Sequence, residues 1–348
     1  MAQQHLEPTD PLAGPVTGDA LAGYLRSQAT EFLRALRQHR EGGAPAQAQE
    51  GPVDAARALR RSVRRISASL HTFRPLLDAD WSESLRPELA WLSGTLGMEH
   101  AYESRLERLL LALHRLSGAV FPTQPTAVMT NGAAHPAPAP DRGNLTVGAA
   151  KAGALLDRQL TLARTRAHST ALQALGSSRF HAVADHIAVL ASEVPLTRTA
   201  PATDLRPLAT AAQERLEDAV TALPLVTAGH PYNAEALIHG LSPDPSPHPQ
   251  DAPWHQVRLL LRLHRYAREA LTGANPPVDG RIHTAGLCLD RHRDASEASA
   301  AAASAARTPR IAPATAYALG VLHADQRHEV EAARFSFQQC WQKQAVTT

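Results

Sequence analysis

The stretch from Ala56 to Leu77, ARALRRSVRRISASLHTFRPLL, places arginines at helical spacing among apolar residues and contains no acidic residue. Its apolar residues recur every three or four positions, which predicts a helix with one buried face. This expected face consists of Leu59, Val63, Ile66, Leu70 and Phe73. The arginines lie beside that face rather than within it, so the stretch predicts a helix that carries a positive stripe.

A second stretch, Trp254 to Leu271, repeats this pattern as WHQVRLLLRLHRYAREAL. In a gap-free alignment the basic positions coincide, Arg57 with His255, Arg60 with Arg258, and Arg64 with Arg262. At about 100° per residue, positions 0, 3, 7 and 10 of either copy, counted from Arg57 or His255, lie within an arc of about 80° on one helix face. The shared frame favours two helices that oppose each other in a duplicated fold and line a positive cleft.

The sequence predicts an all-α protein in two similar halves. No stretch shows sustained alternation of apolar and polar residues, so we expect no sheet. With 348 residues, 44% of them hydrophobic, the chain can bury a core. The expected organisation is a disordered leader at 1–17, a first helical half at 18–117, a connection rich in Pro, Ala and Gly at 118–146, and a second helical half at 147–348 with a proline-rich loop at 224–253.

Apolar periodicity, together with Gly and Pro positions, predicts where the helices begin and end. Beside the two striped helices, we expect helices at about 17–40, 82–116, 147–175, 178–194, 204–223, 281–306 and 313–344, with a short one at 233–239.

Composition and the N-terminal sequence limit the class of protein. The formal charge is only +2, so attraction to an anion must come from local clustering. Cys288 and Cys340 are far apart in sequence and form no CxxC, which predicts neither a disulfide framework nor a zinc site and indicates a reducing cytosol. The N-terminus lacks the features of a signal peptide, and no apolar run approaches the ~18 residues of a membrane span. We therefore expect a cytoplasmic protein without a membrane partner.

Motifs of common enzymes are missing. The sequence contains no GxxxxGK[ST], GxSxG, GxGxxG, HExxH or kinase signature, which predicts a non-enzymatic protein without a cofactor. Asp290, His292 and Asp294 could present alternate metal ligands, but no ligand set of defined spacing accompanies them, and surface histidines on a helix are favoured. We expect no metal site.

Glu99, Glu103 and Glu107 lie on one expected helix face at i, i+4 spacing. Such glutamates could bind a divalent cation and serve a metal-dependent phosphohydrolase. A solvated face, or one paired with arginines, is the favoured interpretation.

The arginine stripes favour a polyanion as partner. Alone, each stripe is explained by solvated or acid-paired arginines, but the repeated frame strengthens the case for an anionic ligand. Guanidinium groups bind phosphate or carboxylate through two parallel hydrogen bonds, and positions one turn apart are spaced by about 5 Å. Aromatic residues make up only 4%, and Trp254 and Tyr266 are expected in the core, so base stacking and hence nucleic acid are disfavoured. A polymer of bare phosphate fits better.

These stretches resemble the CHAD domain, the conserved histidine α-helical domain. The family pattern HxxRxxxRRxR with an FRPLL-like end is similar to Arg57 to Leu77, and HxxRxxxKxxRY is similar to His255 to Tyr266. Four further segments resemble the family in the family's order, at 24–28, 89–97, 177–180 and 317–327. The resemblance covers almost the whole chain after the leader.

The resemblance implies two pseudo-symmetric helical bundles, of about four helices each, around a central basic cavity that binds inorganic polyphosphate. Some members associate with polyphosphate granules, and many are fused to a CYTH triphosphatase domain whose motifs are missing here, so catalysis is not implied. The implied phosphate-binding residues are Arg57, Arg60, Arg64, Arg65, His255, Arg258, Arg262 and Arg265. A nucleic-acid-binding or scaffold module, or a metal-dependent phosphohydrolase, is the alternative.

The chain departs from the family pattern mainly in its first half. Arg57 stands at the histidine position, Ser67 replaces the last arginine, and His100 and Ala101 replace an arginine and an aspartate. The second half keeps His255 and the pair at 293–294. We therefore expect the first half to bind more weakly than the second.

Overall fold

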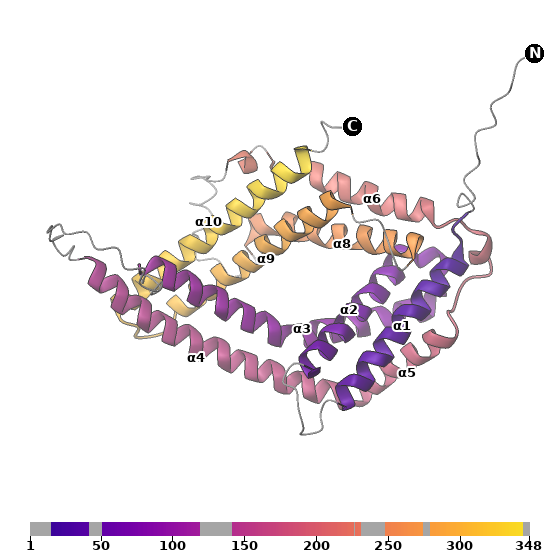
Figure 1. Ribbon diagram of the computed structural model, residues 1–348, viewed down its shortest axis with the longest axis horizontal. Coiled ribbons are helices and arrows are strands. Elements are labelled where there is room, and N and C mark those ends of the chain that lie inside the picture. Colours follow the sequence, from indigo (N-terminus) through magenta and orange to yellow (C-terminus); the bar gives the residue numbers. More distant parts are fainter. Residues whose placement is uncertain are drawn as a thin grey trace, which may run out of the picture. The chain divides into compact units, whose positions relative to one another are not determined.

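The computed structural model describes residues 15–41, 51–118, 141–225, 227–230, 248–273 and 279–343. Over these residues the chain is α-helical, with nine α-helices, short 3-10 turns and two isolated β-bridges (Figure 1). The prediction of an all-α fold is confirmed. The predictions for 1–14, for residues 119–140 of the connection rich in Pro, Ala and Gly, and for the short helix at 233–239 lie outside the described residues.

The helices follow the sequence pattern closely. They are α1 (Gly18–Glu41), α2 (Gly51–Thr72), α3 (Ala79–Leu116), α4 (Asp141–Leu175), α5 (Ser178–Ser192), α6 (Arg206–Thr221), α8 (Ala252–Thr272), α9 (Gly280–Ala306) and α10 (Pro313–Lys343). Helix α3 starts earlier than expected because the Asp78 carboxylate accepts a hydrogen bond from the Trp81 amide at 2.8 Å and so caps the helix. Helix α4 also starts earlier, so residues 141–146 are helical and not part of a loop.

The described residues form two compact units built from interleaved segments. Unit 1 takes those of Met1–Leu96, Gln173–Asp218 and Leu260–Pro277. Unit 2 takes those of Gly97–Leu172, Ala219–Leu259 and Val278–Thr348. Helices α3, α4, α6 and α8 each contribute residues to both units. The division of the chain into two similar halves, at 18–117 and 147–348, stays a prediction.

Unit 1 is built on α1, which packs against both α2 and α5 (Figure 1). The expected apolar face of α2 is confirmed, since all five of its residues are fully buried. Phe32 of α1 meets Phe180 of α5 with ring centroids 6.4 Å apart. A Cβ at Gly18 would lie 2.5 Å from the Ala200 carbonyl oxygen, so only glycine allows this approach at the start of α1.

Unit 2 is built on α9 and α10, which run side by side (Figure 1). Alanines 298, 302 and 305 of α9 are fully buried against Leu319 and Leu322 of α10, because small side chains let two helices approach closely. Cys288 of α9 and Cys340 of α10, far apart in sequence, are free thiols, and Sγ of Cys340 donates to the Phe337 carbonyl oxygen at 3.1 Å. The neighbouring Cys340 thiol lowers the pKa of Cys288 to about 7.

A buried ion cluster lies in the core of unit 2. The carboxylate of Asp251, which is 0% exposed, accepts hydrogen bonds from Arg327 at 2.7 and 3.1 Å, from Arg334 at 2.6 Å and from the Ser296 hydroxyl. Burial raises the pKa of Asp251, but the hydrogen bond and charge of Arg327 outweigh it, and the pKa lies well below its ordinary value. Both carboxylate oxygens of Asp251 are therefore satisfied by protein donors inside the core.

Candidate functional site

The arginine stripe predicted on α2 is present. Seen down the helix axis, the arginines at 57, 60, 61, 64 and 65 cover an arc of about 140° on the side opposite the buried face. Arg57 and Arg61 are exposed, whereas Arg60, Arg64 and Arg65 are half-buried. Arg60, at one edge of the arc, donates to the Ser93 carbonyl oxygen of α3 at 3.1 Å. The opposite edge, at Arg65, faces a different helix.

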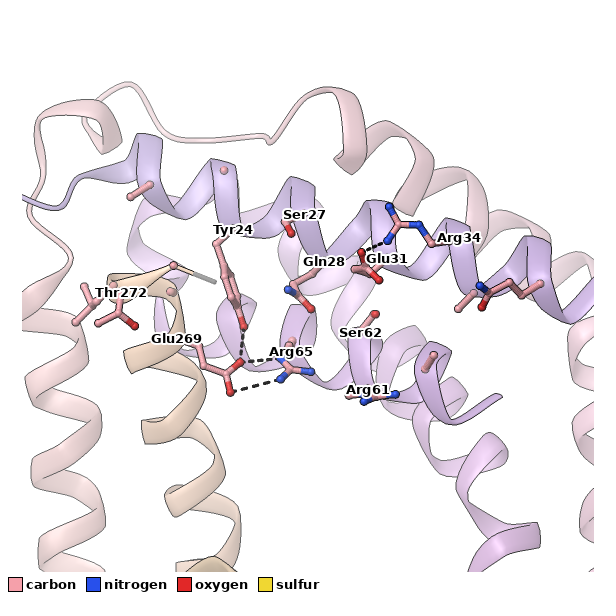
Figure 2. A pocket seen from close by; sticks show the side chains of 18 residues that line it. Tyr24, Ser27, Gln28, Glu31, Arg34, Arg61, Ser62, Arg65, Glu269 and Thr272 are labelled. Carbon is pink, nitrogen blue, oxygen red and sulfur yellow. Dashed lines mark hydrogen bonds and ion pairs between the residues drawn. The ribbon is translucent and has the colours of Figure 1, made fainter. Parts of the chain in front are cut away.

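Arg65 meets the C-terminal part of α8 within unit 1. Its Nε donates to Oε2 of Glu269 at 2.7 Å, and its guanidinium carbon lies 5.4 Å from the centre of the Tyr266 ring. The hydroxyl of Tyr24, on α1, donates to the same carboxylate at 3.2 Å. Figure 2 shows Tyr24 and Arg65 both directed at Glu269. Three helices therefore meet at one carboxylate, here called the Glu269 junction.

Two guanidinium groups share this carboxylate. Arg265, one turn before Glu269 on α8, lies 3.6 Å from Oε1 and 4.9 Å from the Tyr266 ring centre. The junction therefore holds one more positive charge than negative. Burial, followed by the charge of Glu269, raises the pKa of the Tyr24 hydroxyl, which keeps the hydroxyl protonated and able to donate.

A cavity of about 920 Å³ lies beside the junction, between α1, α2 and the end of α8 (Figure 2). Its charged lining consists of Glu31, Arg34, Arg61, Arg65 and Glu269. Glu31 and Arg34 form an ion pair with each other. Arg61 is exposed and makes no hydrogen bond or ion pair to the part of the chain that the structure describes. The cavity wall therefore keeps a positive excess.

The predicted residues of α8 fall into different units. Arg262 and Arg265 belong to unit 1, whereas His255 and Arg258 belong to unit 2. In unit 2, Arg258 donates to the exposed Asp290 at 2.5 Å. His255 packs against His292 with ring centroids 5.4 Å apart, and burial lowers its pKa. Within unit 2 these two residues thus have protein partners.

The surface prediction for His292 is wrong. This side chain is 1% exposed, stacks on Trp254 and accepts a hydrogen bond from Nε of Arg334 at 3.2 Å. The sequence LDRHRD is hydrophilic and so predicted an exposed histidine. Its aspartates, Asp290 and Asp294, do face outward and pair with Arg258 and Arg293, whereas the histidine between them points into the core. Trp254 and Tyr266 are buried, as predicted.

Of the three glutamates predicted on one face of α3, two have basic partners and Glu107 is exposed, in line with the solvated or arginine-paired face favoured from the sequence. Glu103 pairs with Arg164 at 3.3 Å and Glu99 with His168 at 3.0 Å, both from α4. Within the described ranges no group of three or more acidic, histidine or cysteine side chains is arranged to hold a metal ion. Nor does any helix of those ranges combine the length and apolar composition needed to span a membrane.

Sequence comparison assigns the class of protein. The sequence model of the CHAD domain matches residues 27–303, and the chain therefore belongs to the CHAD domain family. It is homologous to PptA from Streptomyces chartreusis, whose solved structure is 71% identical in sequence, covers 94% of this chain and 100% of its own, and has a TM-score of 0.78. The CHAD domain from the plant Ricinus communis is 17% identical, with 96% of each chain covered and a TM-score of 0.49. A search of curated proteins finds no match.

Reasoning from the sequence missed three residues of the Glu269 junction and its cavity: Tyr24, Arg61 and Glu269. Arg61 falls at an unspecified position of the family pattern that starts at Arg57, and it is not a position at which the two striped stretches coincide. Glu269 closes the second stretch, four residues after Arg265, a spacing that signals an ion pair along a helix. Tyr24 has no comparable signal, because its link to residue 269 exists only in the folded chain.

Proposed function

We propose that this CHAD protein binds inorganic polyphosphate through the arginines of α2 and of the C-terminal part of α8. The observation that carries the proposal is the Glu269 junction, where Arg65 and Arg265 share a single carboxylate beside a cavity that Arg61 also lines. Positive charge in excess of its local partners is stabilised by an anion. The proposed ligands in unit 1 are Arg57, Arg60, Arg61, Arg64, Arg65, Arg262 and Arg265.

The chemistry of the residues and the family membership support polyphosphate as the anion. Arginine forks bind phosphate oxygens in pairs and stay charged at any cellular pH. The α2 arginines recur along the helix at rises of about 5 Å per turn, which suits a linear polymer of charges. Tyr266, the aromatic ring at the junction, is buried beneath Arg65 and Arg265 and so is withheld from stacking on bases.

In unit 2, His255 and Arg258 are proposed as a second set of contacts. Arg258 would contribute once an anion competes with Asp290, an exposed carboxylate whose hold on the guanidinium is weak in water. His255 would donate a hydrogen bond, and would gain charge if an anion offsets the burial that lowers its pKa.

We propose binding without catalysis. A metal-dependent phosphohydrolase would need carboxylates available to a metal ion. Of the three acids that such an enzyme would use, Glu99 is engaged by His168 and Glu103 by Arg164, which leaves only the exposed Glu107. Incubation with polyphosphate and Mg²⁺ or Mn²⁺ is expected to release no phosphate, and release that is lost in Glu103→Gln would overturn this part of the proposal.

The test is a titration of long-chain polyphosphate into the full chain at low salt. Reversing two α2 charges, in Arg61→Glu/Arg64→Glu, is expected to weaken binding by about tenfold or more. The matched control is Arg158→Glu/Arg166→Glu on α4, which changes the net charge equally at two exposed arginines without hydrogen bonds or ion pairs in the described part of the chain. It should bind within about twofold of wild type.

Each result bears on a different part of the proposal. Equal loss in both double variants would mean attraction by net charge alone, and unchanged affinity in the α2 variant would exclude the site. Absence of binding at low salt would exclude the function. Affinity should fall as salt rises, because a bound polyanion releases its counterions. Duplex DNA that displaces polyphosphate at equal phosphate concentration would favour the nucleic-acid alternative.

A further inference from the structure

A second basic pocket in unit 1 lies at the C-terminal end of α2, away from the Glu269 junction. Its volume is about 330 Å³. The pocket is lined by residues from α2, from the turn η1 (Arg74–Leu76), from α3 and from α6: His71, Thr72, Arg74, Pro75, Arg86, Leu208, Ala211 and Arg215. Four cationic or potentially cationic side chains thus converge from four elements, and no acidic side chain lines the pocket.

One carboxylate outside the lining serves two of these arginines. Oε1 of Glu83 lies 2.9 Å from Nε of Arg74 and 2.9 Å from NH1 of Arg86. Arg215, on α6, is exposed and makes no hydrogen bond or ion pair to any described residue. Three guanidinium charges are therefore balanced by one carboxylate, which leaves an excess of two. The carbonyl end of α2 opposes this excess with only about half a charge.

A buried hydroxyl provides a second, independent observation. The Thr72 side chain lines the pocket, is 5% exposed, and its Oγ1 has no hydrogen-bond partner within the described residues. A buried hydroxyl is normally hydrogen-bonded, since a buried hydroxyl without a partner costs about 1–3 kcal/mol of folding free energy. This hydroxyl can donate to an anion beside the arginines, which would remove that cost.

We propose that this pocket binds a tetrahedral phosphate group, either inorganic phosphate or the terminal phosphoryl group of a short oligophosphate. Arg74, Arg86 and Arg215 would supply charge and forked donors, and Thr72 would supply a neutral donor. The volume lies at the lower end of the range for small-molecule sites, which suits a small anion and excludes a wrapped polymer. The inference does not depend on polyphosphate binding at the Glu269 junction.

His71 reports on this pocket from within it. Burial lowers the pKa of His71, and the charges of Arg86, Arg215 and Arg74 lower it further, against the raising effect of Glu83. An anion that offsets the arginine charges would raise this pKa, so binding and protonation of His71 favour each other. The imidazole therefore provides a local measurement that distant sites do not affect.

The experiment follows the His71 ring signals by NMR in the full chain, assigned with His71→Asn, during titration with inorganic phosphate, tripolyphosphate and sulfate. Phosphate or tripolyphosphate is expected to shift the His71 signals saturably and raise the His71 pKa. Sulfate keeps its charge between about pH 5 and 8, so its affinity should rise as the pH falls through the His71 pKa. A response to tripolyphosphate alone would assign the pocket to terminal phosphoryl groups, and a response to neither phosphate species would overturn the proposal.

Variants locate the binding. Arg215→Gln is expected to raise the dissociation constant about tenfold, the loss of one charge-assisted hydrogen bond. The matched control Arg198→Gln, at an exposed arginine of the same unit without a described polar partner, should leave it unchanged. Equal effects of both would overturn the proposal. The Arg61→Glu/Arg64→Glu variant should keep the His71 response, so failure at the Glu269 junction can be distinguished from failure here.

Discussion

Two carboxylates, one in each unit, hold two arginines apiece, and they differ in exposure. Asp251 is sealed in unit 2 with Arg327, Arg334 and a serine hydroxyl, and its oxygens are saturated by protein donors. Glu269 in unit 1 is 13% exposed, binds Arg65 closely and Arg265 loosely, and borders a cavity. An arginine beside a carboxylate is thus not by itself a ligand-binding residue; its access to solvent and the charge balance around it decide its role.

The largest expected effect is the loss of the buried carboxylate. Asp251→Asn removes the carboxylate partner of the buried Arg327 and leaves Arg334 with Glu331 alone, so it is expected to lower the free energy of unfolding by about 3–5 kcal/mol. Urea denaturation checks this. Asp290→Asn, which removes an exposed partner of Arg258, should cost less than about 1 kcal/mol. Similar losses in both variants would contradict the contrast between sealed and open pairs.

Acid should destabilise the protein through His292. Burial, followed by the charge of Arg334, lowers the pKa of this histidine well below its ordinary value, so the folded protein keeps it neutral. Below the unfolded pKa of about 6.5, the unfolded chain binds a proton that the folded chain does not, and stability falls by up to about 1.4 kcal/mol per pH unit. The stability that comes from keeping His292 neutral is thus fully present above this pH and is lost as the pH falls.

Denaturation at several pH values between 7 and 5 measures this slope. His292→Gln should flatten it, whereas His283→Gln, at an exposed histidine of the same helix, should not. The difference in this slope between wild type and His292→Gln isolates the contribution of His292. It excludes the contribution of Glu331, whose pKa is raised by burial and which is present in both proteins. An unchanged slope in His292→Gln would contradict the assignment of a neutral buried imidazole.

The open junction should tolerate loss of its carboxylate better than the sealed cluster does. Glu269→Gln removes the partner of Arg65 but leaves both guanidinium groups access to water, so we expect a loss of about 1–2 kcal/mol in unfolding free energy. Glu214→Gln, at an exposed glutamate of α6, is the control and should change little. A loss as large as that of Asp251→Asn would place Glu269 in the structural core.

The smallest effect is expected at Tyr24. Tyr24→Phe removes one hydrogen bond to Glu269 and keeps the ring, so the loss should be about 0.5–1.5 kcal/mol. Tyr317→Phe, at an exposed tyrosine of α10, is the matched control. Thermal unfolding followed by circular dichroism is sufficient to compare them. A gain in stability in Tyr24→Phe would mean that the hydrogen bond from this hydroxyl to Glu269 does not stabilise the fold.

Helix periodicity predicted most of the fold, because each helix buries one face and the pattern of that face is local in sequence. The expected face of α2 and the burial of Trp254 and Tyr266 are confirmed for this reason. The partners of the charged residues were not predictable. Asp251 and Arg327, or Tyr24 and Glu269, meet only through tertiary packing, and nothing in the sequence near either residue specifies the other. The interleaving of chain segments in the two units could not be predicted from the sequence for the same reason.

In the proposed function, the Glu269 junction binds polyphosphate because its positive charge exceeds its negative charge. Titration of long-chain polyphosphate into two variants tests this most directly. We expect opposite changes: Arg61→Gln should raise the dissociation constant by about five- to tenfold, and Glu269→Gln should lower it several-fold, because the anion no longer competes with a carboxylate. Changes of the same sign in both variants, or none in either, would contradict it.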